Sequence, residues 1–372
     1  MSSKVFVLPI EEYDKSLIKE KLNVAIESFN LNFKNKKVLL KPNLLMPAPP
    51  NRAITTHPII IESIVETLID KGAKELLIGD SPGNNRSTVQ GLYEITGMKK
   101  VAEKTGARLV NFSTEGVIEF TTKNNVKIPV TKIVKEVDYI INLPKLKTHQ
   151  LTLMTCAIKN IFGTIPGFNK TKMHTTFPNA KDFSELLVDL FNFVKPALNI
   201  VDAIIGMEGD GPSAGEPKKF GKIIVGDDPV AVDTVAGWIL GYKPQDVKTT
   251  VLAKEKGLGN YEFDKIELIG ATWEEIYGRN VKRGKNYYGI TLKLPSFPTK
   301  LIAPLIEKIL KVSPVINDEK CIKCKICMES CPQKAIYLEN GKMKINYKEC
   351  ISCFCCHELC PQQAIDLKRL FL

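Results

Sequence analysis

The order of apolar and polar residues up to about residue 290 alternates between two patterns. A helical period places the apolar residues of 17–29 and of 61–69 on one face of each segment. Helices that alternate with buried strands are typical of an α/β domain with a mostly parallel sheet. Residues 117–130 instead resemble a β-hairpin with its turn near Asn124 and Asn125, so we expect the sheet to be parallel or mixed. Short, mostly apolar runs predict buried strands at 38–40, 76–78, 139–141, 200–205 and 223–225.

The rest of the chain divides into a connecting segment and a cysteine-rich segment. Residues 296–313 carry a short apolar stripe between prolines, which predicts a linker helix packed between domains. A helix on a membrane surface is the alternative, although the stripe is short for that role. Residues 314–372 contain an internal repeat with an offset of 29 positions. We therefore expect an α/β domain over 1–295, a linker helix over 296–313 and a small α+β domain over 314–372.

The repeated unit has the spacing C-x2-C-x2-C-x3-C-P, and the segment resembles bacterial-type two-cluster ferredoxins over its whole length. Three cysteines of each unit share one loop, and the fourth points to the other cluster. Two [4Fe–4S] clusters are therefore expected as cofactors, which implies electron transfer. We expect one cluster to be held by Cys321, Cys324, Cys327 and Cys360, and the other by Cys350, Cys353, Cys356 and Cys331.

Other interpretations of the cysteine-rich segment remain open. Zinc held by four cysteines is the alternative metal, although zinc sites rarely repeat this spacing with proline after the last ligand. Cys355 and Cys156 fit packing positions, and no neighbouring base activates Cys156. His357 fits a surface position on a helix, because four thiolates already complete each cluster.

Charge and cysteine usage narrow the classes of partner. The chain has a formal net charge of +11, and the segment from Ser313 onward contributes only nine Lys and Arg against seven Asp and Glu. A basic α/β domain suits an anionic substrate, an acidic redox partner or nucleic acid, although a solvated lysine-rich surface is equally compatible. Nine of the ten cysteines lie in 321–360, which is not the distribution of a disulfide scaffold. No apolar run is long enough to cross a membrane, so we expect a cytoplasmic protein without membrane contact.

Polar segments follow five of the predicted strands of the α/β domain. In open α/β sheets, ligands bind beyond the carboxyl ends of the strands, and parallel strands bring those ends to one edge. We therefore expect all five segments to meet at one edge of the sheet. They are Lys41–Asn43, Gly79–Gly83, Asn142–His149, Gly206–Pro212 and Asp227–Pro229.

These segments and their neighbours supply two groups of candidate site residues. Each has a structural alternative: His57 precedes a proline that can begin a helix, and Gly79–Gly83 makes a good turn. The candidates for catalysis are Lys145, Lys147, His149, Asp80, Glu208 and His57. The candidates for binding an anionic substrate or cofactor are Lys41, Asn43, Lys159, Asn160, Gly209 and Gly211.

Taken together, these residues resemble the motifs of the family named only as domain of unknown function 362. Its members often carry a two-cluster ferredoxin domain at the C-terminus. The resemblance implies this architecture and an association with anaerobic redox metabolism, but no particular reaction or set of catalytic residues. The matching pieces are Lys41-Pro42-Asn43, Thr56-His57-Pro58, Gly79-Asp80-Ser81-Pro82-Gly83, Pro144–His149, Ala157–Gly163 and Gly206–Pro212.

Three functions are compatible with the sequence. We favour a reductive enzyme whose clusters exchange low-potential electrons with an external donor or acceptor and pass them to an anionic substrate or cofactor on the α/β domain. The alternative is an electron-transfer or activating protein whose α/β domain docks a partner protein. Nucleic-acid binding is less compatible, because the chain has no Arg-rich stripe and no interleaved aromatic platform.

Overall fold

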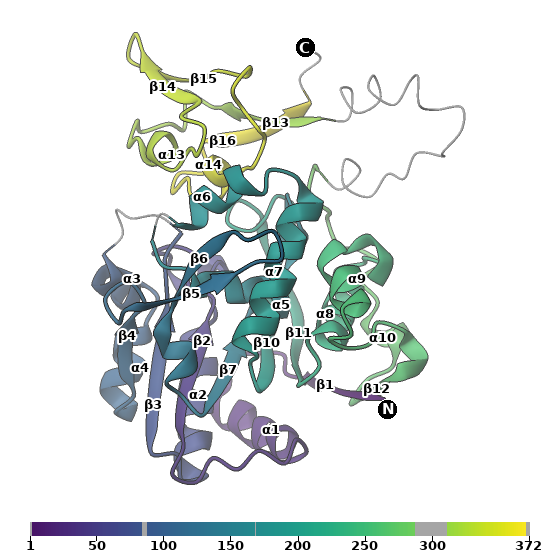
Figure 1. The fold of residues 1–372 in the computed structure, drawn as a ribbon. Helices are drawn as coiled ribbons and strands as arrows, with labels where there is room; N and C mark the ends of the chain where they lie inside the picture. The colour runs from purple at the N-terminus through teal and green to yellow at the C-terminus, as the bar shows by residue number, and fades with distance from the viewer. Residues whose placement is uncertain (1, 84–87, 168, 287–310, 370–372) are drawn as a thin grey trace.

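The structure is a computed structural model that describes residues 2–83, 88–167, 169–286 and 311–369. These residues form a large α/β domain and a small domain that lies against one end of it (Figure 1). The predicted linker helix over 296–313 falls mostly outside the described residues. The described chain resumes at Lys311, and the first strand of the small domain begins at Val312.

The large domain is built around ten strands of one mixed sheet. Eight of them lie side by side in the order β12-β1-β11-β10-β7-β2-β3-β4, and β8 and β9 extend the sheet beside β10. The strands are β1 (Ser3–Pro9), β2 (Lys37–Pro42), β3 (Glu75–Asp80), β4 (Arg108–Asn111), β7 (Tyr139–Leu143), β8 (Lys145–His149), β9 (Leu153–Thr155), β10 (Leu198–Glu208), β11 (Glu216–Gly226) and β12 (Ile266–Ile269). A separate hairpin of β5 (Val117–Thr121) and β6 (Lys127–Thr131) confirms the predicted hairpin.

Helices cover both faces of this sheet, because successive residues of its buried strands point to opposite sides and both are apolar. Val38 and Leu40 of β2 pack with α1, α2 and α4, whereas Leu39 packs with α5 and α7. A further cluster joins β1, β10 and β11 to α8. The helices are α1 (Lys15–Glu27), α2 (Pro58–Asp70), α3 (Val89–Ile95), α4 (Met98–Thr105), α5 (Ala157–Asn160), α6 (Asn169–Thr176), α7 (Ala180–Val194), α8 (Pro229–Ile239), α9 (Lys248–Glu255) and α10 (Trp273–Ile276).

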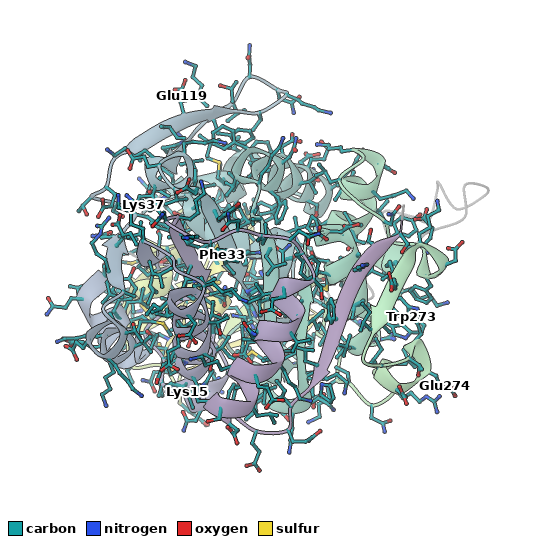
Figure 2. The ribbon with its side chains drawn as sticks, turned by 90° about the horizontal axis from the view of Figure 1, so that it is seen from below. Lys15, Phe33, Lys37, Glu119, Trp273 and Glu274 are labelled. Atoms are coloured by element: carbon teal, nitrogen blue, oxygen red, sulfur yellow. The ribbon has the colours of Figure 1, made fainter. Side chains whose placement is uncertain are left out.

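Figure 2 shows the same layers from below. Phe33 lies near the middle of this view and is 1% exposed, whereas Glu119 and Glu274 reach the periphery. Short 3-10 turns complete the large domain at Pro50–Arg52, Lys132–Lys135, Ile161–Thr164, Pro244–Asp246 and Phe263–Lys265. Within the residues that the structure describes, no helix combines the length and the apolar character that a bilayer crossing requires.

The expectation that all five polar segments meet at one edge of the sheet is corrected by its topology. β2, β3 and β7 are parallel neighbours and β10 is parallel to β7, so the carboxyl ends of these four strands do meet. β11 instead runs antiparallel to β10, which puts Asp227–Pro229 at the opposite edge. The polar segment after Leu143 continues as a strand: Lys145–His149 forms β8, which pairs with β10 and β9.

Residues 151–163 have an irregular backbone. They form the short strand β9, then the four-residue helix α5, and then a 3-10 turn. Cys156 lies between β9 and α5 and is buried, as its interpretation as a packing residue requires. This irregular backbone matters for the site, because it presents Thr155, Lys159 and Asn160 at the sheet edge.

The small domain contains two copies of one structural unit. Two antiparallel strand pairs flank two short helices, and each helix follows one cysteine loop. The elements are β13 (Val312–Ile316), α13 (Ile326–Glu329), β14 (Ile336–Glu339), β15 (Lys342–Ile345), α14 (Cys355–Glu358) and β16 (Ile365–Arg369). With the large mixed sheet, this arrangement confirms the predicted fold class.

Candidate functional site

Each of the two cysteine sets surrounds a cavity in the small domain. In both cavities, the fourth cysteine of one repeat lies with the three loop cysteines of the other, which is the crossing that the sequence predicts. One cavity is lined by Cys321, Cys324, Cys327 and Cys360, and the other by Cys331, Cys350, Cys353 and Cys356.

The donor chemistry of both cavities fits a cationic iron–sulfur centre. Burial and then the neighbouring sulfurs raise the pKa of Cys327 to about 12, and burial also raises the pKa of Cys356. Four thiolates so close together need positive charge, which iron ions supply. In the described part of the chain, no group of three or more His, Cys, Asp or Glu side chains is arranged for a single metal ion. Four cysteine sulfurs per cavity match the ligand set of a [4Fe–4S] cluster.

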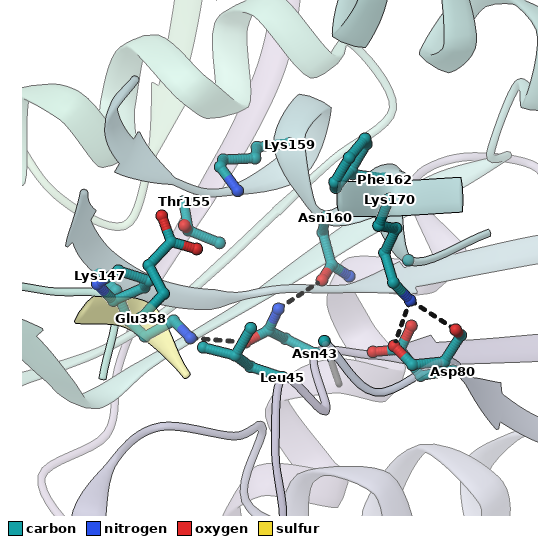
Figure 3. Close-up of a pocket in the computed structure, with 14 residues that line it drawn as sticks. Asn43, Leu45, Asp80, Lys147, Thr155, Lys159, Asn160, Phe162, Lys170 and Glu358 are labelled. Atoms are coloured by element: carbon teal, nitrogen blue, oxygen red, sulfur yellow. Dashed lines mark hydrogen bonds between the residues drawn. The ribbon is translucent and has the colours of Figure 1, made fainter. Parts of the chain in front are cut away.

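A third cavity lies at the carboxyl ends of β2 and β3, where the large domain meets the small one (Figure 3). Five of the candidate residues from the sequence line it, together with residues that the sequence did not single out. The lining residues are Asn43, Leu45, Asp80, Ser81, Gly83, Lys147, Thr155, Lys159, Asn160, Phe162, Gly163, Lys170, Pro212 and Glu358. We call this space the lysine cavity, after the three lysines that line it.

The three lysines bring positive charge that the surrounding protein does not neutralise directly. Lys147 Nζ donates to Asn43 Oδ1 and to the carbonyl of Ile54, each at 2.7 Å, and Lys170 Nζ donates to the carbonyl of Ser81 at 2.9 Å. Lys159 Nζ lies 5.8 Å from the centre of the Phe162 ring. Among the described residues, none of the three ammonium groups forms an ion pair with a carboxylate.

Burial acts on the pKa values of these lysines. It lowers the pKa of Lys147 well below its ordinary value, and the neighbouring Lys159 and Lys145 lower it further. It also lowers the pKa of Lys170, to about 7. A bound anion would reverse both effects, because an opposite charge at contact distance favours the protonated amine.

Beside these lysines, a buried ion pair forms part of the cavity wall. Lys41 Nζ lies 2.8 Å from Asp80 Oδ1, and Asp80 Oδ2 accepts from the backbone N–H of Leu44 at 2.6 Å. A Cβ atom at Gly163 would lie 2.1 Å from Asp80 Oδ1 and 2.7 Å from Lys41 Nζ. Glycine is therefore required at 163 for the α5 region to approach this pair.

A chain of side-chain amides fixes the floor of the cavity. Asn43 Nδ2 donates to Asn160 Oδ1 at 3.0 Å, and Asn160 Nδ2 donates to Asn142 Oδ1 at 2.8 Å. Asn142 Nδ2 in turn donates to Asn199 Oδ1 at 2.9 Å. Because each amide orients the next, Asn43 is held with its oxygen toward Lys147 (Figure 3).

The small domain closes one side of the cavity through α14. Glu358, the last residue of this helix, lines the cavity, and its Oε1 lies 3.1 Å from His149 Nε2. Burial raises the pKa of Glu358, but His149, Lys159 and His174 outweigh that effect and bring it to about 2. Burial lowers the pKa of His149 to about 4. At neutral pH the carboxylate is therefore ionised beside a neutral imidazole.

Three further hydrogen bonds attach the small domain beside Glu358. Ser213 Oγ donates to the carbonyl of Glu358 at 2.6 Å, and Gln363 Nε2 donates to the carbonyl of Ser213 at 3.1 Å. His357 Nε2 lies 3.0 Å from the carbonyl of Asp210. His357 is 3% exposed, which corrects its sequence-based placement on the surface.

Lys145 and His57 belong to a separate buried cluster that does not line the lysine cavity. Lys145 Nζ lies 2.8 Å from Asp202 Oδ2, and both side chains are fully buried. Tyr13 OH donates to Asp202 Oδ1 at 3.0 Å, and the Tyr13 ring stacks on the ring of His57. The backbone N–H of His57 donates to Asp202 Oδ2, and its ring Nδ1 caps α2. These contacts give Lys145 and His57 structural partners.

Three other candidates also lie apart from the lysine cavity. Glu208 forms an ion pair with Lys218 and accepts from the backbone N–H of Lys282. Gly209 has a positive φ of 75°, which suits glycine. A Cβ atom at Gly211 would lie 2.2 Å from the carbonyl of Thr148, so glycine is required there for close packing.

The fold and its cavities define an α/β protein fused to a cysteine-rich domain of the iron–sulfur class. Residues 38–237 match the family described as Domain of unknown function (DUF362), and residues 313–361 match the 4Fe-4S dicluster domain. The chain therefore belongs to the DUF362 family and carries a dicluster ferredoxin domain. This confirms the resemblance inferred from the motifs.

Similar proteins cover each part of the chain. The thylakoid-associated protein sll1697 of Synechocystis is 30% identical over 263 residues, which are 69% of this chain and 81% of that protein. The ketoisovalerate oxidoreductase subunit VorD of Pyrococcus furiosus is 46% identical over 84 residues, which are 22% of this chain and 73% of that protein. The dicluster domain and the VorD match support an iron–sulfur electron-transfer role.

Among solved structures, the lactate racemase apoprotein from Thermoanaerobacterium thermosaccharolyticum superposes with a TM-score of 0.42 and 12% identity. The match covers 61% of this chain and 54% of that protein. A protein from Thermotoga maritima gives a TM-score of 0.41 at 13% identity, over 65% of this chain and 59% of its own. Likeness at this level does not establish a common fold.

Proposed function

We propose that the protein is a reductive iron–sulfur enzyme with its own electron relay. Two [4Fe–4S] clusters in the small domain take low-potential electrons from an external donor. An anionic substrate or cofactor in the lysine cavity receives these electrons. We also propose a cytoplasmic, anaerobic setting. The clustering of nine of the ten cysteines in 321–360, at metal-ligand spacing, supports a reducing compartment.

The observation that carries this proposal is that α14 contributes residues to two neighbouring cavities. Cys356 of this helix lines one cysteine cavity, and Glu358, two residues later, lines the lysine cavity. A cluster in that cysteine cavity would therefore lie close to a ligand among the lysines. Electron tunnelling falls steeply with distance, so this proximity is what a fused relay needs.

The lysine cavity supplies the second line of support. Lys147, Lys159 and Lys170 line one small space without a direct carboxylate partner among the described residues. Cations held in a buried site attract an anion more strongly than the same cations in water. Charge-assisted hydrogen bonds contribute about 1.5–3 kcal/mol each, so loss of one lysine should weaken anion binding roughly tenfold to a hundredfold.

The test is an anaerobic reoxidation assay on the full protein with reconstituted clusters. The clusters are reduced with dithionite, the excess is removed, and a panel of carboxylates and phosphate monoesters is added, each with a carbonyl group or conjugated double bond that can take up two electrons and two protons. We expect one class of anion to reoxidise the clusters, as followed by their visible absorbance. Lys159→Met should slow this reaction at least tenfold at limiting anion concentration.

A matched control separates the site from a general loss of charge. Lys248 of α9 is half-buried like Lys159, and burial lowers its pKa as well, but it does not line the cavity. The clusters of the Lys248→Met variant should therefore be reoxidised at the same rate as those of the wild type. Equal rates for Lys159→Met and the wild type, with every anion that reacts, would remove the lysine cavity from the proposal.

The alternative is an electron-transfer or activating protein that passes its electrons to a partner protein. It is favoured by the similarity of the small domain to VorD, whose name describes a subunit of a larger oxidoreductase. In that case no small anion reoxidises the clusters, and anaerobic purification yields a stable complex with a second protein. The reoxidation panel therefore distinguishes the two functions.

A further inference from the structure

The two halves of the small domain have the same backbone but different surroundings. In the second half, Phe354 and Leu367 are buried and pack with Val312. The internal repeat places Lys325 and Leu338 at the corresponding positions of the first half. Both are exposed, Leu338 by 44%. The first half therefore presents an apolar and basic surface where the second half has a closed core.

The two cysteine loops also differ in charge, and the first loop is the more basic one. Lys320, Lys323 and Lys325 of the first loop are all exposed. Among the described residues, none of their ammonium groups forms an ion pair. The corresponding residues of the second loop are Glu349, Ser352 and Phe354. Three positive charges thus stand where the other loop has a single negative charge.

This surface lies directly over one of the cysteine cavities. Ile322 and Lys325 line the cavity of Cys321, Cys324, Cys327 and Cys360. Ile322 is nevertheless 61% exposed, so it covers the cavity on one side and meets solvent on the other. The second loop leads into α14, whose His357 and Glu358 contact the large domain.

We propose that Lys320, Ile322, Lys323, Lys325 and Leu338 form a docking surface for an acidic electron-transfer protein. Its electrons enter at the cluster held by Cys321, Cys324, Cys327 and Cys360. This inference rests on the proposed function, in which an external donor feeds the clusters. Charge complementarity identifies the partner: exposed lysines together with exposed apolar side chains steer an acidic surface and repel a basic one.

The test uses an acidic flavodoxin in its hydroquinone form as the probe. One electron leaves the anionic hydroquinone, which becomes the neutral semiquinone, and one cluster gains that electron without transfer of any atom. The reaction is followed by stopped flow under anaerobic conditions at several salt concentrations. Because no substrate is added, failure here is distinct from failure of the reductase proposal.

The variant Lys320→Glu/Lys323→Ser gives the first loop the residues of the second. The backbone tolerates the change at 323, because Lys323 and Ser352 share a positive φ of 55° and 52°. The matched control is Lys100→Ser/Lys123→Glu, which makes the same charge change at exposed positions of the large domain. Lys325→Gln serves as a second variant that removes one charge only.

The double variant is expected to accept electrons from flavodoxin about tenfold more slowly at low salt, with a weaker salt dependence. Lys325→Gln should give a smaller loss of the same kind. Cluster absorbance, reduction by dithionite and the control variant should all match the wild type. The proposal is overturned if the double variant is reduced by flavodoxin as fast as the wild type, or if the control loses as much.

Discussion

Asp80→Asn is the most direct perturbation of the cavity wall. Asp80 uses both carboxylate oxygens, one toward Lys41 Nζ and one toward the backbone N–H of Leu44. Asparagine keeps the shape but has only one acceptor oxygen. Whichever way the amide turns, its NH2 group faces another donor, and the charge of Lys41 loses its partner.

The size of the effect follows from the burial of the pair. Lys41 is 0% exposed and Asp80 is 3% exposed, so water cannot replace the lost carboxylate. Removing one partner of a buried ion pair costs about 3–5 kcal/mol. Lys41→Met/Asp80→Asn removes the uncompensated charge as well, so the double variant should recover most of the loss and stay within about 1–2 kcal/mol of the wild type.

Urea unfolding followed by tryptophan fluorescence measures this difference. Both tryptophans of the chain, Trp238 and Trp273, lie in the large domain, so the signal reports on the domain that contains the pair. The double-mutant cycle then isolates the coupling of Lys41 with Asp80. A loss below about 1 kcal/mol in Asp80→Asn, or no recovery in the double variant, would refute the assignment of a charged buried pair.

Three further predictions concern the lysine cavity. Gly163→Ala should destabilise the large domain by about 1–3 kcal/mol and weaken anion binding, both measured by thermal unfolding with and without the anion, because its Cβ would lie 2.1 Å from Asp80 Oδ1. The pKa of Lys170, lowered to about 7 from 10.5, means that its positive charge is present below pH 7 and lost above it. Anion affinity measured by calorimetry should therefore fall as pH rises through about 7, and Lys170→Arg, which stays charged, should flatten that profile. Chelation of iron should also weaken anion binding, because the four-residue α14, which closes one side of the cavity, is too short to persist without its cluster, and its loss exposes the lysines to water; unchanged affinity in the iron-free protein would contradict this link.

The sequence predicts the sheet well where apolar runs are short and buried. Residues 38–40 and 76–78 fall inside β2 and β3, and the hairpin around Asn125 forms as expected. The direction of β11 was missed because the predicted strands at 200–205 and 223–225 leave residues 206–222 between them, which is long enough for a parallel crossover. In the structure both strands are longer, and residues 209–215 between them are too few for such a crossover, so the connection is antiparallel.

Sequence-based prediction of the candidate site rests mostly on residues that follow strands directly. Asn43, Asp80 and Lys147 were found in that way. Glu358 was missed because its role depends on how the two domains meet, which no local pattern encodes. Lys170 does not follow a predicted strand, so the same reasoning could not identify it.

Lys145 lies outside the lysine cavity for a similar reason: its surroundings depend on a contact with a residue that is distant in the sequence. Its neighbour Lys147 points into the cavity, but Lys145 is paired with Asp202. Asp202 is 57 positions away in the chain. The sequence shows that both lysines follow a buried strand. It does not show which of them has a carboxylate within reach, and that difference decides which lysine can bind a substrate.

The asymmetry of the repeat gives the proposed relay a direction. A symmetric pair of cluster sites could pass electrons either way, but here the halves carry different residues at matching positions. The second half ends its helix in Glu358, which lines the lysine cavity, whereas the matching residue of the first half is the exposed Glu329. The first half instead has the exposed lysines 320, 323 and 325 around its cysteine loop. The two halves thus differ in the neighbour that each one faces, and in the proposed relay electrons enter through the first half and leave through the second.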